Sequence, residues 1–234
     1  MRVFITGVSS GIGRELTRQL VRAGHEVFGV ARRESELADL GRELGPRFSF
    51  ARCDVRSKEA ISQVLRMLEA CAFLPDVVVL NAATMGAEAR EVFETNVLGA
   101  LGWVEGFIER FLRRGSGQFI AVASIAAFRP DGSNIAYAAS KAALAMAFRG
   151  LRLRYKTTPL RFKAIYFGPV ATLIDPRFSE VKSKVKIFFV ISVERAARAV
   201  LRAMQGRSND YYAPFWLAFV FRLSSILPDT WYRA

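Results

Sequence analysis

The chain has 234 residues, 52% hydrophobic and 24% charged, which is enough apolar material for one substantial core. Its two cysteines, Cys53 and Cys71, form no disulfide framework and no zinc-site spacing, so we expect two reduced thiols and no metal site. The formal net charge of +13 favours an anionic ligand or surface, but no nucleic-acid-binding module is recognisable and we expect no nucleic-acid partner.

Short apolar runs alternate with amphipathic segments of helical length along most of the chain. We expect strands at residues 2–6, 26–30, 48–53, 77–80, 118–123 and 161–167. We expect helices to begin near Gly11, Glu34, Ser57, Arg90, Tyr137 and Ser192. Apolar strands linked by helices predict an α/β fold with a doubly wound parallel sheet, a Rossmann-like three-layer α/β/α arrangement in a single domain spanning 1–234.

The first strand begins at residue 2, which leaves no room for a secretion signal, so we expect a cytoplasmic protein. This strand ends at Thr6 and is followed by a glycine-rich loop. Glycines allow a close backbone approach to phosphate, and the first N–H groups of the next helix face the anion. The loop therefore predicts a pyrophosphate cradle, with a purely structural turn as the alternative. The cradle residues are Gly7, Ser9, Ser10, Gly11, Ile12 and Gly13.

The end of the second strand indicates which dinucleotide is bound. Sites for NAD place an acidic side chain here to bind the ribose 2′-hydroxyl, whereas sites for NADP offer arginine to the 2′-phosphate. Here Ala31 is followed by Arg32 and Arg33, with no acid. We therefore expect NADP(H) to be favoured over NAD(H); two solvated arginines at a helix start are the alternative.

A group suited to acid–base catalysis follows the fifth strand. Tyr137 and Lys141 are four residues apart on one helix face, so the ammonium can approach the phenol and favour its ionised form. Tyr137 could then exchange a proton with a substrate, while the Ser124 hydroxyl positions a carbonyl oxygen.

These features together resemble the short-chain dehydrogenase/reductase family. The opening TGVSSGIG is similar to its TGxxxGxG loop, and YAASK is similar to its YxxxK motif, thirteen residues after the serine. The resemblance implies that Asn96 completes a catalytic tetrad with Ser124, Tyr137 and Lys141. It also implies dimers or tetramers built on the helices that contain Asn96 and Tyr137. Further cofactor contacts are implied at Asp54 and Val55, beside the adenine, and at Asn81, Ala82 and Ala83.

Two departures from the family pattern affect the nicotinamide side. The family's Pro-Gly turn is Phe167-Gly168 here, although the contacts implied at Gly168, Val170 and Thr172 remain available. The gap between Asn81 and Asn96 is several residues shorter than usual, which predicts altered substrate access.

One segment is unusually basic, and two others have no clean helix or strand pattern. The basic run 149–163 is interpreted as the solvated face of a helix, with a membrane surface as the alternative. Residues 173–191 are interpreted as a substrate loop. The apolar aromatic tail 211–234 is too short and too interrupted to span a bilayer. It is expected to pack against the body or a second subunit, or else to lie in a membrane interface.

Two functional hypotheses follow. The first is an NADPH-dependent reductase of a ketone or aldehyde, or the reverse dehydrogenase, acting on an apolar or lipid-like small molecule. The second is an NADP(H)-binding sensor or scaffold, attached to a membrane or partner through the tail. Turnover that depends on Tyr137 separates the two.

Overall fold

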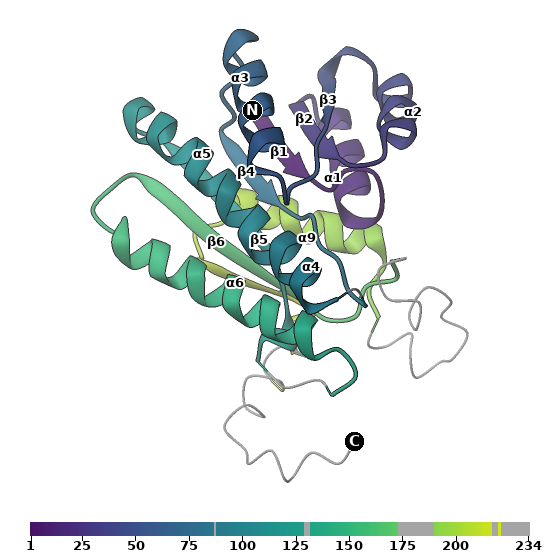
Figure 1. The fold of residues 1–234 in the computed structure, drawn as a ribbon, viewed down its shortest axis with the longest axis vertical. Helices are drawn as coiled ribbons and strands as arrows, with labels where there is room; N and C mark the ends of the chain where they lie inside the picture. Colours follow the sequence, from purple (N-terminus) through teal and green to yellow (C-terminus); the bar gives the residue numbers. More distant parts are fainter. Residues whose placement is uncertain (87, 129–131, 173–189, 217–219, 221–234) are drawn as a thin grey trace.

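A computed structural model describes residues 1–86, 88–128, 132–172, 190–216 and 220, and it confirms the doubly wound α/β fold (Figure 1). Seven strands form one sheet in the order β3-β2-β1-β4-β5-β6-β7, and every pairing is parallel. The strands are β1 Arg2–Thr6, β2 Glu26–Ala31, β3 Phe48–Arg52, β4 Val77–Leu80, β5 Gly117–Ser124, β6 Leu160–Phe167 and β7 Asp210–Ala213. The first six match the predicted strands to within one residue at each end.

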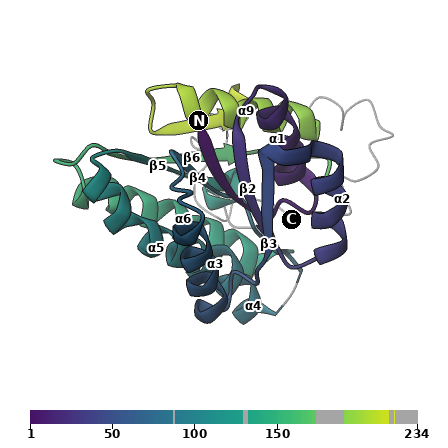
Figure 2. The same ribbon diagram turned by 90° about the horizontal axis from the view of Figure 1, so that it is seen from above.

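Helices cover both faces of the sheet (Figure 2). Helices α1 (Gly11–Arg22), α2 (Glu34–Leu44) and α9 (Val193–Gln205) pack on one face. Helices α3 (Lys58–Ala70), α5 (Gly99–Arg114) and α6 (Ile135–Arg154) pack on the other. Two short 3₁₀ turns, Gly45–Arg47 and Ile125–Ala127, complete the regular structure of the described residues, apart from the α4 region treated below.

Two helix starts show why the boundaries were predictable. Ser57 and Ser192 precede α3 and α9, and the hydroxyl of each accepts a hydrogen bond from a first-turn N–H group. Glu194 lies in the first turn of α9, where its charge suits the positive end of the helix. Such caps are local, so the sequence alone identifies them.

The helix predicted to begin near Arg90 is three consecutive pieces. Helix α4 covers Ala89–Phe93, a π-helical turn covers Glu94–Leu98, and α5 follows directly. Helices α4 and α5 flank the turn that contains Asn96. A π turn inserts an extra residue and is frequent at functional sites.

The sequence did not predict strand β7. The tail was predicted to begin at Tyr211, yet Tyr211, Tyr212 and Ala213 belong to a strand that pairs with β6 and completes the sheet. A four-residue strand inside an aromatic run has no distinctive pattern of its own, so only its pairing defines it.

Much of the two remaining predicted segments lies outside the described residues. Of the substrate loop 173–191, residues 190 and 191 are described, and Ile191 forms an isolated parallel bridge with Val170. Of the tail 211–234, residues 211–216 and 220 are described. Among the helices described, none combines the length and apolar character needed to cross a bilayer.

Candidate functional site

The predicted site residues gather at one edge of the sheet, because every parallel strand ends on the same side. The loop after β1 is closely packed there. Gly7 has φ of +76°, and a Cβ on Gly13 would lie 2.3 Å from the Gly7 carbonyl oxygen. The Asn81 amide after β4 donates to the carbonyl oxygens of Thr6 and Gly7 at 3.0 and 3.1 Å. Asn81 therefore fixes the loop from the neighbouring strand.

The start of α1 is suited to an anion. Ser10 precedes the helix in an extended conformation, and its side chain makes no capping hydrogen bond. The first N–H groups of a helix have no intrahelical partners, so those of α1 remain available to a phosphate. Gly11 has φ of +55°, and a Cβ on it would point at the Thr172 methyl group, 3.4 Å away. The loop and Thr172 thus face each other, and the residues fit a dinucleotide diphosphate.

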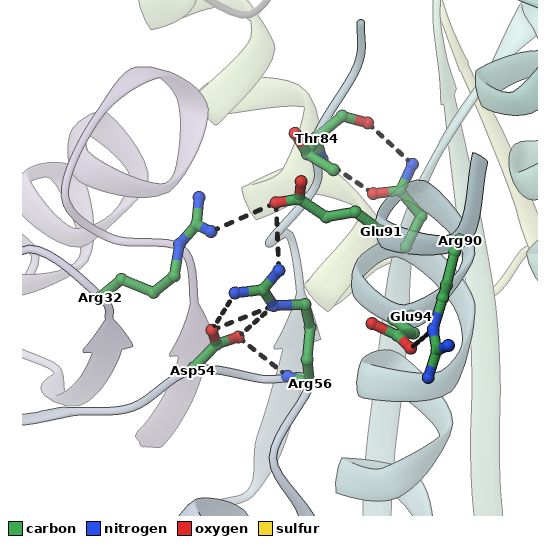
Figure 3. A network of polar contacts seen from close by, with 8 residues as sticks. Arg32, Asp54, Arg56, Thr84, Arg90, Glu91 and Glu94 are labelled. Atoms are coloured by element: carbon green, nitrogen blue, oxygen red, sulfur yellow. Dashed lines mark hydrogen bonds and ion pairs between the residues drawn. The ribbon is translucent and has the colours of Figure 1, made fainter. Parts of the chain in front are cut away.

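The two arginines after β2 contact different partners. Arg33 donates from Nη2 to the Ser9 hydroxyl at 2.9 Å and pairs with Glu36 at 3.2 Å. The structure therefore brings together the glycine-rich loop and the end of β2. Arg32 extends instead toward α4, where its Nη1 lies 3.6 Å from Glu91 Oε1 (Figure 3).

Asp54 is held by an arginine that sequence reasoning did not single out. Arg56 Nε lies 3.0 Å from both Asp54 carboxylate oxygens, and Nη2 lies 2.6 Å from Oδ2 (Figure 3). The hydrogen bonds from Arg56 lower the pKa of the Asp54 carboxyl. Arg56 Nη1 also lies 3.2 Å from Glu91. An ionic network thus joins the ends of β2 and β3 to α4.

Asn96 is buried, and its side-chain amide is hydrogen-bonded to neighbouring residues. Its Oδ1 accepts from the Thr84 backbone N–H at 2.8 Å, and its Nδ2 donates to the Thr84 carbonyl and to the Ser140 hydroxyl, each at 3.0 Å (the Thr84 contacts are drawn in Figure 3). The Ser140 hydroxyl donates to the Tyr137 carbonyl oxygen at 2.7 Å. Asn96 therefore supports the first turn of α6, which contains Tyr137.

Lys141 and Tyr137 lie together, as their spacing predicted. Lys141 is 2% exposed, its Nζ lies 5.6 Å from the centre of the Tyr137 ring, and it donates to the Val122 carbonyl at 2.9 Å. Burial lowers the pKa of Lys141 to about 8. The amine can thus change its charge close to physiological pH, beside the phenol.

Ser124 is the last residue of β5. Its hydroxyl accepts from the Ala126 N–H at 3.2 Å and donates to the Phe167 carbonyl at 3.4 Å. The 3₁₀ turn that follows Ser124 contacts α6, which begins two residues before Tyr137. Ser124 therefore lies at the same edge of the sheet as the start of α6.

The segment after β6 keeps an ordered turn without the family's proline. Gly168 donates its N–H to the Ala213 carbonyl at 2.9 Å, which extends the pairing with β7. Ala171 and Ile191 are joined by an N–H···O=C bond of 3.0 Å. These bonds position the segment from Val170 to Thr172, which faces the glycine-rich loop at Gly11.

The remaining cofactor positions lie near these groups with less specific contacts. Ala82 donates its N–H to the Thr6 hydroxyl at 3.0 Å, and Val55 is buried where Gly99 approaches it. Ile12 and Ala83 are half-buried. Sequence reasoning missed Arg56, Glu91 and Ser140, because their relevance comes only from contacts with other segments.

Comparison with known proteins agrees with this arrangement. A family model described as short chain dehydrogenase matches residues 1–182. An uncharacterized oxidoreductase of Myxococcus xanthus is 28% identical over 98% of this chain and 94% of its own length. The NADP-dependent 3-hydroxy acid dehydrogenase YdfG of Escherichia coli is 29% identical over 79% of this chain and 77% of its own. A solved serine dehydrogenase complexed with NADP⁺ is 26% identical, with a TM-score of 0.80, over 91% of this chain and 94% of its own.

Proposed function

Because the chain belongs to the short-chain dehydrogenase family and is an NAD(P)-dependent oxidoreductase, we propose that it reduces a ketone or aldehyde with NADPH, or oxidises the alcohol in reverse. The observation that carries this proposal is the pairing of Tyr137 with buried Lys141 at the edge of the sheet where the glycine-rich loop lies.

The preference for NADP(H) over NAD(H) is supported by the end of β2. Ala31 stands where an NAD site has an acid, and the two guanidinium groups that follow can form charge-assisted hydrogen bonds with a 2′-phosphate. The contact between Arg33 and Ser9 brings one of these groups to the loop. YdfG is named as NADP-dependent, and the serine dehydrogenase contains NADP⁺.

In the proposed reaction, the bound reduced nicotinamide supplies the hydride. Ser124 donates a hydrogen bond to the carbonyl oxygen, and Tyr137 gives that oxygen a proton. Lys141, when charged, lowers the cost of the Tyr137 phenolate that remains. Asn96 positions the start of α6 through Ser140.

An apolar substrate is supported by an aromatic cluster beside Ser124. Phe128 directly follows the 3₁₀ turn after Ser124, and its ring centre lies 4.7 Å from that of Tyr166. Tyr166 stacks on Tyr212 at 5.2 Å, and Phe215 lies 6.5 Å from Tyr212. Phe215 is 73% exposed, so this edge of the sheet offers apolar surface to a ligand. Four further aromatic residues of the predicted substrate loop and tail lie outside the described residues: Phe178, Phe188, Phe189 and Phe219.

A direct test is the Tyr137→Phe variant, with Tyr155→Phe at the end of the same helix as a matched control. We expect Tyr137→Phe to lower the turnover of apolar ketones by about 100-fold or more while NADPH still binds, because only the proton donor is lost. Tyr155→Phe should retain activity, since Tyr155 packs on Phe162 away from Lys141. NADPH absorbance and fluorescence titration measure turnover and binding.

The sensor hypothesis gives the opposite result. If the wild-type protein binds NADPH but turns over no ketone, aldehyde or alcohol, the reductase proposal fails. Equal turnover by the wild type and Tyr137→Phe would instead contradict the role given to Tyr137.

We also propose a homo-oligomer, which is supported by an apolar stripe on α6. Ile135, Met146 and Leu153 are 73%, 61% and 73% exposed. Their spacing of about three and then two helical turns places them along one line of the helix. Leu98, 62% exposed, comes from the π turn that packs against α6.

A further inference from the structure

Arg32, which the proposed function places at the 2′-phosphate, already has a carboxylate partner. Its Nη1 lies 3.6 Å from Glu91 Oε1 on α4 (Figure 3). The side chains of Arg32 and Glu91 are 55% and 35% exposed, so a ligand can reach both groups. Within the part of the chain that is described, Glu91 is the carboxylate that lies within ion-pair distance of Arg32.

Arg56 does not depend on Glu91 in the same way. The same Glu91 oxygen lies 3.2 Å from Arg56 Nη1, but Arg56 also makes side-chain hydrogen bonds of 2.6 to 3.0 Å with both oxygens of Asp54. Loss of the Glu91 charge therefore leaves Arg56 anchored, whereas it removes the ion pair that Arg32 makes within the described residues.

In the proposed complex, the 2′-phosphate of NADP(H) and the Glu91 carboxylate would both pair with the Arg32 guanidinium. A dianion that approaches Arg32 is attracted by the arginine and repelled by the carboxylate beside it. Partly exposed ion pairs of this kind are weak, so a phosphate can displace Glu91 at a modest cost in affinity. NAD(H) has no 2′-phosphate and does not compete for Arg32.

We propose that Glu91 is a specificity-determining residue that competes with the 2′-phosphate for Arg32 and thereby weakens NADP(H) binding relative to NAD(H). This inference rests on the proposed contact between Arg32 and the 2′-phosphate. It assigns to α4 a function in cofactor choice that the motifs do not indicate.

The test compares Glu91→Gln with Glu94→Gln, which changes the net charge equally three residues away. Glu94 pairs with Arg90 at 2.7 Å and makes no ion pair with Arg32. We expect Glu91→Gln to lower the Kd for NADPH by about 3- to 10-fold at low ionic strength and to leave the Kd for NADH within about twofold. Glu94→Gln should leave the ratio of the two Kd values near that of the wild type.

Arg32→Ala and the double variant complete a cycle that isolates the pair. Arg32→Ala should weaken NADPH more than NADH, and adding Glu91→Gln to it should then strengthen NADPH less than it does in the wild type, because only the direct repulsion between carboxylate and phosphate is removed. The inference is overturned if Glu91→Gln strengthens both cofactors equally, matches Glu94→Gln, or acts equally without Arg32. If Arg32→Ala weakens both cofactors equally, the proposed 2′-phosphate contact itself fails, and the inference fails with it.

Discussion

At the scale of single residues, burial determines how Lys141 can act. Its Nζ is enclosed between the Val122 carbonyl and the Tyr137 ring, and removal from water disfavours the charged amine. The pKa of Lys141 is therefore lowered to about 8, compared with 10.5 for an ordinary lysine. The charge that assists Tyr137 is therefore present at lower pH and is lost as the pH rises through about 8.

This lowered pKa predicts a pH dependence of carbonyl reduction. We expect kcat/KM to be flat near pH 7 and to fall as the pH rises through about 8, because deprotonated Lys141 no longer stabilises the Tyr137 phenolate. Profiles of kcat/KM against pH for the wild type and Lys141→Met test this expectation, since kcat/KM reports the pKa values of groups in the free enzyme. The variant should have low activity with no decline near pH 8. A wild-type profile that stays flat to pH 9.5 would contradict the assignment.

At the scale of secondary-structure elements, the basic run 149–163 is more than a solvated helix face. Arg149, Arg154 and Lys156 are exposed as that interpretation requires. Arg152, however, pairs with both Asp210 carboxylate oxygens at 2.7 and 2.9 Å, which ties α6 to β7. Lys163 is 1% exposed in β6 and donates to the carbonyls of Ala203 and Gly206, at 2.7 and 2.6 Å.

Lys163 therefore satisfies carbonyl groups at the end of α9 that have no intrahelical partners. We expect Lys163→Met to lower the free energy of unfolding by about 2 kcal/mol, because buried acceptors lose their donor. Lys156→Met, an exposed change of the same kind, should be nearly neutral. Urea unfolding followed by circular dichroism measures both variants, and equal stability of the two would show that the Lys163 contacts contribute nothing.

At the scale of the whole molecule, the two sides of α6 have different surroundings. The inner side of α6 carries Lys141 and Leu144 into the core, while its outer side carries the apolar stripe of Ile135, Met146 and Leu153. A helix that is apolar on two opposite sides is typically buried on both of them. The outer stripe is the surface that the proposed homo-oligomer would bury.

The stripe gives a prediction about assembly. We expect Met146→Glu to shift the protein toward monomer in analytical ultracentrifugation, because a carboxylate would be buried in the apolar interface. Met67→Glu on α3 is the matched control, since Met67 is 46% exposed on a different helix and should not change the mass. A wild-type protein that sediments as a monomer would exclude this assembly.

Much of the fold was predictable because its determinants are local. Continuous apolar runs predicted six strands, and Ser57 and Ser192 identified helix starts through their own hydroxyl groups. The glycine-rich loop, Ser124 and the YxxxK pair, and their order along the chain, can likewise be read directly from the sequence. The four-residue spacing also predicted the approach of Lys141 to Tyr137.

The tertiary structure alone decided which distant residues share a contact. Strand β7 exists because β6 offers it an open edge, and Lys163 is a buried cap because α9 ends above β6. Glu91 meets Arg32 only because β2 and α4 lie at the same end of the sheet (Figure 3). The sequence by itself determined the elements and the chemistry that each carries, since periodicity and capping act over a few residues. Contacts between elements depend on strand order and packing, which no short stretch of sequence encodes.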